Sequence, residues 1–278
     1  MKTKHLRLMQ RAYIILFFCF MYLPIAYMIV FSFNQSKGYA LFTGFTLKWY
    51  VSLFHNSSIL HALWVSIEVA LLSAVIATVL GTAASLGIAS MGRKSRLVVT
   101  NITYIPVVNP EIITGISLML LFVAYQRFTE GVDFLPDTIM GLPTLLIAHI
   151  AFNVPYVIFN VTPKLKQLDI RLYEAALDLG ANASVALRKV VIPQLIPGIV
   201  SGFMLSVTLS LDDYFITTYT KPATFDTIST YVVNATKGSH TEIKTALWAL
   251  STLIFVIIVA GVLVWNLLSE KKGGADNE

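Results

Sequence analysis

Six long apolar stretches dominate the sequence, and no other feature limits the possible folds so strongly. Each contains about 20 or more residues, the length that an α-helix needs to cross a bilayer core about 30 Å thick. The chain has 278 residues, of which 56% are hydrophobic and 13% charged, whereas soluble domains average about 45–50% and about 25%. The sequence therefore predicts an all-α membrane protein with six transmembrane helices, at residues 12–33, 62–91, 97–125, 141–162, 195–219 and 245–268.

The shortage of charge excludes several classes of protein. A surface with so few charged residues is not that of a soluble enzyme or a nucleic-acid binder, although the net charge is +5. The single cysteine, Cys19, excludes an internal disulfide or a cysteine-based zinc site. The sequence contains no G-x4-G-K-[ST] phosphate loop, no H-E-x-x-H and no G-x-S-x-G, and its five histidines are scattered. We therefore expect a non-catalytic chain with no metal or cofactor of its own.

The basic residues predict the topology. Fourteen of the 20 lysines and arginines lie in the N-terminal tail, in the loops after the second and fourth stretches, and in the C-terminal tail. Because cytoplasmic segments carry an excess of these residues, both termini are expected in the cytoplasm. The first stretch is too long for a signal peptide and is interpreted as an uncleaved helix. We expect an N-terminal tail, first helix and outer interfacial segment (1–61), a core of five helices (62–268) and a cytoplasmic tail (269–278).

The longest cytoplasmic loop, residues 164–193, has a helical pattern of its own. Residues 171–180 have the composition of a helix, with Gly180 at its C-terminal end. Its apolar face repeats at i, i+3, i+4 and i+7, at Leu172, Ala175, Ala176 and Leu179. A second short helix is expected at 183–189, ending before Pro193. The apolar face either packs against the base of the bundle or the lipid headgroups, or it docks a cytoplasmic partner.

The same loop contains Glu174-Ala-Ala-x3-Gly180-x9-Val190-x-Ile192-Pro193, which resembles the EAA motif of ABC importer permeases (EAA-x3-G-x9-I-x-L-P). Val190 and Ile192 differ from that motif but keep its size and polarity. The resemblance implies a type I ABC importer permease fold, in which this loop is the coupling helix. It also implies that a separate dimer of ATPase subunits binds ATP and Mg. The positions that would contact the ATPase are Glu174, Ala175, Ala176 and Gly180.

Four further blocks resemble the PotC-type permeases of spermidine/putrescine ABC transporters. The blocks are FSFN (31–34), GFTLKWY (44–50), NPEII (109–113) and LSLDD (209–213). The resemblance implies that the chain forms half of a polyamine pathway that works by alternating access in a bacterial inner (plasma) membrane. Besides lipid, the implied partners are a second, homologous permease chain, the ATPase dimer and an extracytoplasmic polyamine-binding protein.

Four acidic residues lie within the predicted helices, namely Glu68, Glu111, Asp212 and Asp213. An acid at the centre of a transmembrane helix costs roughly 2.5–3.5 kcal/mol on insertion scales, so it usually faces a cavity, a partner or a pathway. At about 1.5 Å per residue, all four fall in the outer half of the membrane. They predict a pathway that attracts a cation from outside, where Tyr214 adds a cation–π contact.

The two adjacent aspartates cannot serve one spot equally, because neighbouring residues on a helix point about 100° apart. Asp213 is favoured for the position facing the pathway, since it continues a polar stripe formed by Ser206, Ser210 and Thr217. The alternative is that the acids hydrogen-bond within the bundle, or with a second permease, and never meet the substrate. His149 is interpreted as a hydrogen-bonded residue of the bundle.

Two other functions remain open from the sequence. One is a permease of the same architecture for another small, cationic solute, because the acids do not separate spermidine, putrescine and other cations. Four acids and no basic residue deep in a span argue against an anion. The other is a stand-alone channel, carrier or membrane enzyme, which leaves the EAA motif unexplained.

Overall fold

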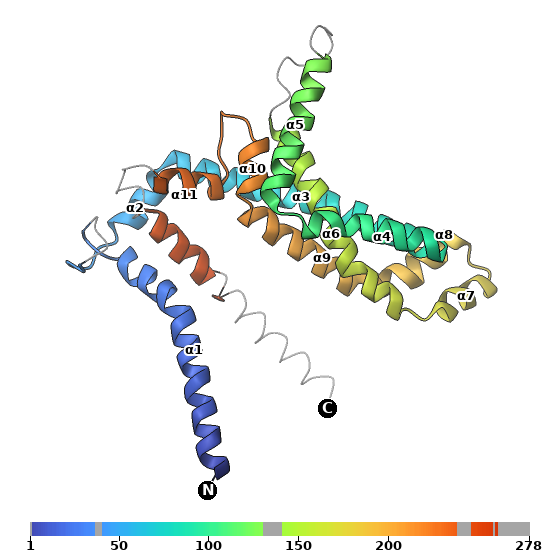
Figure 1. Ribbon diagram of the computed structural model, residues 1–278, viewed down its shortest axis with the longest axis horizontal. Coiled ribbons are helices and arrows are strands. Elements are labelled where there is room, and N and C mark those ends of the chain that lie inside the picture. The colour runs from blue at the N-terminus through green and yellow to red at the C-terminus, as the bar shows by residue number, and fades with distance from the viewer. Residues whose placement is uncertain (1, 37–40, 130–140, 238–245, 258, 261–278) are drawn as a thin grey trace. The chain divides into compact units, whose positions relative to one another are not determined.

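The computed structural model describes residues 2–36, 41–129, 141–237, 246–257 and 259–260. Within these residues the regular secondary structure is helical (Figure 1). The exception is an isolated antiparallel bridge between Asn34 and Phe45. The contacts divide the chain into two units, one formed by Met1–Leu60 with Val232–Glu278 and the other by His61–Tyr231. The predicted all-α fold is confirmed.

The helices of the first unit include α1, α2 and a shorter apolar helix, at Lys2–Ser32, Lys48–His55 and Ala246–Ile257. At the end of α1 the chain folds back on itself. The indole Nε1 of Trp49 donates a hydrogen bond to the carbonyl of Asn34 (2.7 Å), and the Thr46 amide donates to the carbonyl of Phe33 (2.8 Å). The sequence blocks at 31–34 and 44–50 therefore lie against each other.

Most of the second unit consists of α3, α4, α5, α6, α9 and α10. Their bounds are Ser57–Ser90, Arg93–Val108, Glu111–Thr129, Leu142–Gln167, Ile192–Asp212 and Phe215–Thr220. The boundary between the two units falls within α11 (Ile228–Lys237). Helices α6 and α9 pack side by side, and glycines permit their close approach. A Cβ atom at Gly198 would lie 3.0 Å from the carbonyl oxygen of Asn160, and one at Gly202 would lie 3.2 Å from Cα of Val157.

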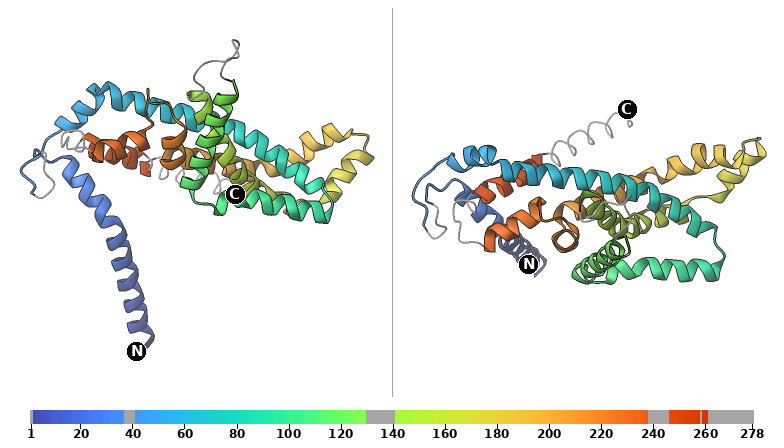
Figure 2. Two further views of the ribbon diagram at one scale, coloured as in Figure 1. Left: turned by 45° about the horizontal axis from the view of Figure 1, so that its top comes forward. Right: turned by 90° about the horizontal axis from the view of Figure 1, so that it is seen from above.

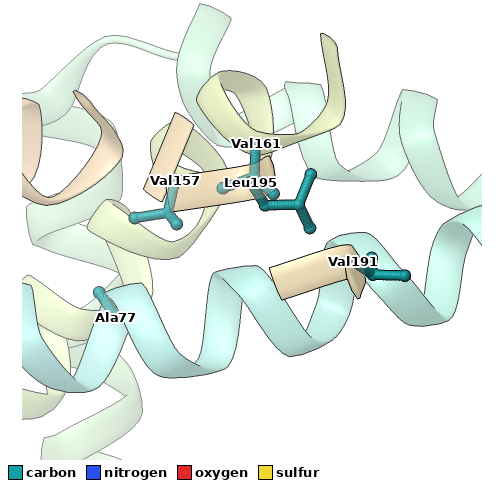
Figure 3. Packing of buried hydrophobic residues seen from close by; sticks show 5 residues of the cluster. All are labelled: Ala77, Val157, Val161, Val191 and Leu195. Atoms are coloured by element: carbon teal, nitrogen blue, oxygen red, sulfur yellow. The ribbon is translucent and has the colours of Figure 1, made fainter. Parts of the chain in front are cut away.

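An apolar cluster joins α3 to α6 and to the start of α9 (Figure 3). Helix α3 contributes Ala77, helix α6 contributes Val157 and Val161, and the α9 side contributes Val191 and Leu195. Four of these side chains are completely buried, namely Ala77, Val157, Val161 and Leu195. Tight packing of these apolar side chains therefore holds α3, α6 and α9 together as one framework.

Five helices among the described residues are long and apolar enough to cross a membrane. They lie at Met9–Ser32, Ser57–Ser90, Glu111–Thr129, Leu142–Gln167 and Ala183–Asp212. Three of the six predicted stretches thus match such helices closely in position, and two more, 97–125 and 195–219, match in part. The last prediction, 245–268, is represented by the shorter helix Ala246–Ile257, and its end lies outside the described residues.

The third predicted helix, 97–125, is wrong as a single helix. The chain leaves the helical conformation at Asn109 (φ −73°, ψ 136°), so that α4 and α5 are separate. Pro110 explains the break, because it has no N–H to donate and it disfavours helical backbone in the residue before it. No side chain of α4 is buried within the chain.

The fifth predicted helix, 195–219, is also interrupted. Helix α9 ends at Asp212, and α10 begins at Phe215. Asp213 between them has extended backbone (φ −64°, ψ 124°). The polar stripe expected from an unbroken helix therefore has a different geometry, which is described below.

The expectation that a second loop helix ends before Pro193 is wrong as well. Helix α8 (Ala183–Ala186) continues through the π-helical turn η1 (Leu187–Val191) into α9. Pro193 cannot donate a backbone hydrogen bond, and a π-helical turn is a common way to absorb such a defect. The side-chain amide of Gln194 also donates to the carbonyl of Val190 (3.0 Å).

Gly81→Ala is expected to disturb the packing of α3 on α6. The added Cβ would lie 2.6 Å from Cβ of Val157 and 3.1 Å from the carbonyl oxygen of Val154, so one helix must shift. We expect a loss of about 1–3 kcal/mol in stability, measured as a lower Tm of the purified chain in detergent. Gly87→Ala on the same helix is the control, because no neighbouring atom lies within 4 Å of its added Cβ. An unchanged Tm for Gly81→Ala would contradict this packing.

Candidate functional site

The break between α9 and α10 is closed by the side chain of Asp213. Its carboxylate accepts hydrogen bonds from the amides of Ile216 (3.2 Å) and Thr217 (2.7 Å) and from the Thr217 hydroxyl (2.7 Å). Asp213 is 4% exposed. Amides in the first turn of a helix have no partner within that helix, and an aspartate oxygen is a favoured acceptor for them. Asp213 therefore caps α10 in a buried position.

A polar network from α6 surrounds this cap. His149 is completely buried, and its Nε2 lies 2.9 Å from the Thr217 hydroxyl and 3.7 Å from Oδ2 of Asp213. Its Nδ1 lies 3.1 Å from the hydroxyl of Ser210 on α9. The amide of Asn153 also donates to Ser210 (2.8 Å). The interpretation of His149 as a hydrogen-bonded bundle residue is confirmed.

The structure separates the two neighbouring aspartates. Asp213 is buried within the chain, as are the other members of the predicted stripe, whereas Asp212 at the end of α9 is exposed. These other members are Ser206, Ser210 and Thr217. Two of them, Ser210 and Thr217, contact His149 on α6. Asp212, which the sequence ranked second, is the aspartate whose side chain is accessible.

Glu111 joins this region through the packing of α5 on α10. A Cβ atom at Gly115 would lie 3.1 Å from the carbonyl oxygen of Phe215 and 3.2 Å from Cα of Ile216, so the first turns of both helices are in contact. Exposed Glu111 lies within electrostatic range of Asp212 and Asp213. Three of the four predicted acids are thereby brought together from distant parts of the sequence.

Aromatic side chains border the acids. Tyr214, between the two helices, is half-buried, and its ring centroid lies 5.3 Å from that of Phe215. Tyr156 on α6 lies within electrostatic range of Glu111. Nothing in the sequence marked Tyr156 as a functional residue, because a single tyrosine in an apolar helix does not stand out from its neighbours. Glu68, the fourth predicted acid, is half-buried on α3, and its role in a pathway stays a prediction.

The loop helix α7 (Ile170–Asp178) has defined ends. The Asp169 carboxylate accepts a hydrogen bond from the Arg171 amide (3.0 Å) at its start. At its end Gly180 has a left-handed backbone (φ 87°), and its amide donates to the carbonyl of Leu177 (2.9 Å). Left-handed backbone after a helix favours glycine because a Cβ is strained there. The predicted helix and its terminating glycine are confirmed.

The exposure of α7 distinguishes packing of its apolar face within the chain from docking of a partner. Tyr173 is half-buried and packs against the cluster around Leu195. On the predicted apolar face, however, Leu172 is 48% exposed and Leu179 is 89% exposed. The motif residues Glu174 and Ala175 are exposed too, while Ala176 is half-buried. Tyr173 thus ties the helix to this cluster, and most of its predicted apolar face is left uncovered by this chain.

The two candidate surfaces lie at opposite ends of the α6–α9 pair. Figure 2 shows α7 and α8 beyond the end of the pair where α9 begins, and the acids lie at the end where α9 stops. Helix α9 has 21 residues, which gives a length of about 30 Å at 1.5 Å per residue. This is the thickness of a bilayer core.

No group of three or more histidine, cysteine or acidic side chains suited to a metal ion is present within the described residues. The two exposed acids at the α9–α10 break, Glu111 and Asp212, form a negatively charged surface with aromatic neighbours. Such a surface attracts organic cations through charge–charge and cation–π interactions.

Comparison with known proteins identifies relatives over most of the chain. A family model described as "Binding-protein-dependent transport system inner membrane component" matches residues 77–272. The chain is 30% identical over 267 residues to the spermidine/putrescine transport system permease protein PotC of Escherichia coli (strain K12), covering 96% of each chain. It is 33% identical over 263 residues to the putrescine transport system permease protein PotI of the same strain, covering 93% of this chain and 90% of that protein.

A solved structure confirms the fold class. One chain of a bacterial ABC transporter involved in the import of the acidic polysaccharide alginate superimposes with a TM-score of 0.76 at 19% identity. The match covers 97% of this chain and 96% of that chain. At this level of identity the likeness concerns the fold alone, which is the importer permease fold expected from the sequence.

Asp213→Ala is expected to destabilise the chain, because the buried amides of Ile216 and Thr217 lose their acceptor. The expected loss is about 1–3 kcal/mol, measured as a lower Tm of the purified chain in detergent. Asp212→Ala is the matched control, since its side chain is exposed, and it should change stability by less than about 0.5 kcal/mol. Equal Tm values for the two variants would contradict the capping role of Asp213.

Proposed function

The chain belongs to the family of binding-protein-dependent transport system inner membrane components, and we propose that it is the permease subunit of an ATP-driven importer of polyamines. Members of this family are non-catalytic membrane subunits. The observation that carries the substrate class is the gathering of Glu111, Asp212 and Asp213 beside Tyr214 at the α9–α10 break. The names of the relatives PotC and PotI point to the same substrates.

The chemistry of this surface suits a polyamine. A polyamine carries several ammonium groups separated by short methylene chains, so it can pair with separate carboxylates and lay its methylenes on aromatic rings. Exposed Asp212 and Glu111 supply two carboxylates on different helices. Buried Asp213 adds negative charge behind them. In the low dielectric of a membrane protein these charges attract a cation more strongly than in water.

Energy for transport comes from another subunit in this proposal. The exposed apolar side chains of α7, chiefly Leu172 and Leu179, form the surface that docks an ATPase. The ATPase dimer binds ATP and Mg, and its closure pushes α7. Because Tyr173 packs against the cluster that joins α6 and α9, movement of α7 reaches both long helices.

The remaining partners complete an alternating-access cycle. An extracytoplasmic binding protein delivers the cation, which enters between this chain and a second, homologous permease. The positive-inside pattern of the sequence supports a cytoplasmic position for α7. The acids at the other end of α9 then receive the cation from outside, in agreement with their predicted place in the outer half of the membrane.

Asp212→Asn is expected to lower the maximal rate of ATP-dependent polyamine uptake at least about tenfold, because a charge-assisted contact to the cation is lost. Uptake of labelled spermidine and putrescine is measured in proteoliposomes that contain the complete complex. Asp226→Asn is the control, since the Asp226 carboxylate is already paired with Nζ of Lys221 (3.1 Å). Normal uptake by Asp212→Asn would contradict the proposed site. Transport of another small cation but of no polyamine by the unaltered complex would favour the alternative substrate class.

Gly180→Ala is expected to weaken binding of the ATPase subunit about 5–30-fold, because alanine pays about 1–2 kcal/mol to adopt the left-handed backbone that ends α7. Gly92→Ala is the matched control: neither glycine has a neighbouring atom within 4 Å of the added Cβ, and the backbone of Gly92 (φ −61°) suits alanine. Affinity is measured by titrating the purified ATPase onto reconstituted permease. Equal affinities for the two variants would show that this helix end does not shape the docking surface.

A further inference from the structure

We infer that His149 is a positioning residue for the cation site. It ties Ser210 in the last turn of α9 and, through Thr217, the Asp213 cap to α6, and it thereby fixes the direction in which Asp212 leaves the end of α9. The inference rests on the proposed function, because it assigns a supporting layer to the same site. His149 itself is completely buried and lies behind the exposed acids.

The contacts of His149 join three helices at one point. The residue belongs to α6, Ser210 belongs to α9, and Thr217 belongs to α10. The two ring nitrogens lie 3.1 Å from the Ser210 hydroxyl and 2.9 Å from the Thr217 hydroxyl. Asp213 Oδ2 is 3.7 Å from Nε2. The imidazole therefore spans the break and connects both sides of it to α6.

The direction of each hydrogen bond follows from the carboxylate. The Thr217 hydroxyl donates its hydrogen to Oδ2 of Asp213 (2.7 Å), so it can only accept from His149. Nε2 of His149 must then be the protonated nitrogen, and Nδ1 accepts from the Ser210 hydroxyl. The chain of donors runs from Ser210 through His149 and Thr217 to Asp213. Each member orients the next, and every hydrogen in the chain is used.

This network bears directly on Asp212. Asp212 is the last residue of α9 and is joined by one peptide bond to Asp213, whose backbone is extended (ψ 124°). Ser210, which contacts Nδ1 of His149, lies in the last turn of α9 two residues before Asp212, so the imidazole also holds the turn that carries the Asp212 side chain. A binding group needs its geometry held within about 0.5 Å by such supporting contacts. Without the imidazole, Asp213 keeps the α10 amides but loses its tie to α6.

Packing alone does not account for a histidine here. The Ser210 hydroxyl also contacts the Ser73 hydroxyl (3.1 Å) and the Asn153 amide (2.8 Å), so the surroundings of the ring are polar as well as buried. A buried polar network is costly unless it is satisfied, and an apolar side chain would serve packing at lower cost. The contacts thus favour a role in orientation.

Uptake kinetics test the role directly in proteoliposomes that contain the complete complex. His149→Leu is expected to lower the maximal rate of spermidine uptake at least about tenfold. The concentration of loaded binding protein that gives half the maximal rate should stay within about twofold, because docking outside is unaffected. His149→Gln keeps a donor near the position of Nε2 and should restore much of the rate. Thr217→Val should resemble His149→Leu, and the double variant should be no worse than either alone.

A second tie between α6 and α10 supplies the matched control. The Thr144 hydroxyl on α6 lies 3.1 Å from the carbonyl oxygen of Thr220 at the far end of α10 and 2.9 Å from that of Gly141 at the start of α6. Thr144→Val removes both contacts and leaves the Asp213 network in place, so near-normal uptake is expected. Equal losses in Thr144→Val and His149→Leu would overturn the inference, because attachment of α10 in general would then be what matters. Normal uptake by His149→Leu, or failure of His149→Gln to restore any rate, would also overturn it.

A spin label at position 212 separates this inference from the proposed function. Asp212→Cys is labelled in a Cys19→Ser background, because Cys19 is exposed. Adding His149→Leu should broaden the distribution of label orientations, whereas adding Thr144→Val should not. This readout needs no substrate, so it tests the inference even if the unaltered complex carries no polyamine, which would refute the proposed function alone. An unchanged spectrum with His149→Leu would refute the positioning role.

Discussion

A buried carboxylate at the end of α9 determines much of what surrounds it. Where a helix stops inside an apolar environment, each unpaired backbone amide costs several kcal/mol unless a partner is supplied. Asp213 supplies that partner for Ile216 and Thr217. The direction of α10 follows from this cap, and the packing of α5 through Gly115 follows from the position of α10. The gathering of Glu111 with the two aspartates is therefore a consequence of how one helix ends.

The middle and the ends of the α6–α9 pair differ in chemistry. Between the ends, glycines and an apolar cluster hold the helices in close contact, and the cluster also receives Tyr173 of α7. At one end the polar network around His149 secures the break. Close-packed interiors transmit displacement with little compression. In the proposed cycle, a push on α7 thus reaches the acids about 30 Å away through a single packed framework.

Hydropathy predicted the all-α fold and most of the spans, since a bilayer requires long apolar helices whatever their partners. It failed at 97–125 and 195–219, because a window of composition does not report which amide lacks an acceptor. Pro110 was a readable signal for the first break. The second depends on Asp213 reaching Thr217 across a turn, which looks like a continuous polar stripe in the sequence. The family motif located Gly180, whose left-handed backbone the structure confirms.

The site itself was predictable only in part. Acids in apolar helices marked the right residues, but their assembly depends on contact between α5 and α10, which are far apart in the sequence. The ranking of Asp213 above Asp212 followed from helical periodicity, and the break reverses which of them is exposed. Tyr156 gave no signal at all, and Glu68 stays a prediction.

The central claim is that the exposed acids at this break receive the transported cation. A structure of the complete complex with spermidine trapped inside tests it most directly. We expect an ammonium group within about 3 Å of the Asp212 carboxylate, beside Glu111, with Asp213 still buried against His149. Spermidine bound away from these residues, with Asp212 paired to a basic side chain of the second permease, would contradict it.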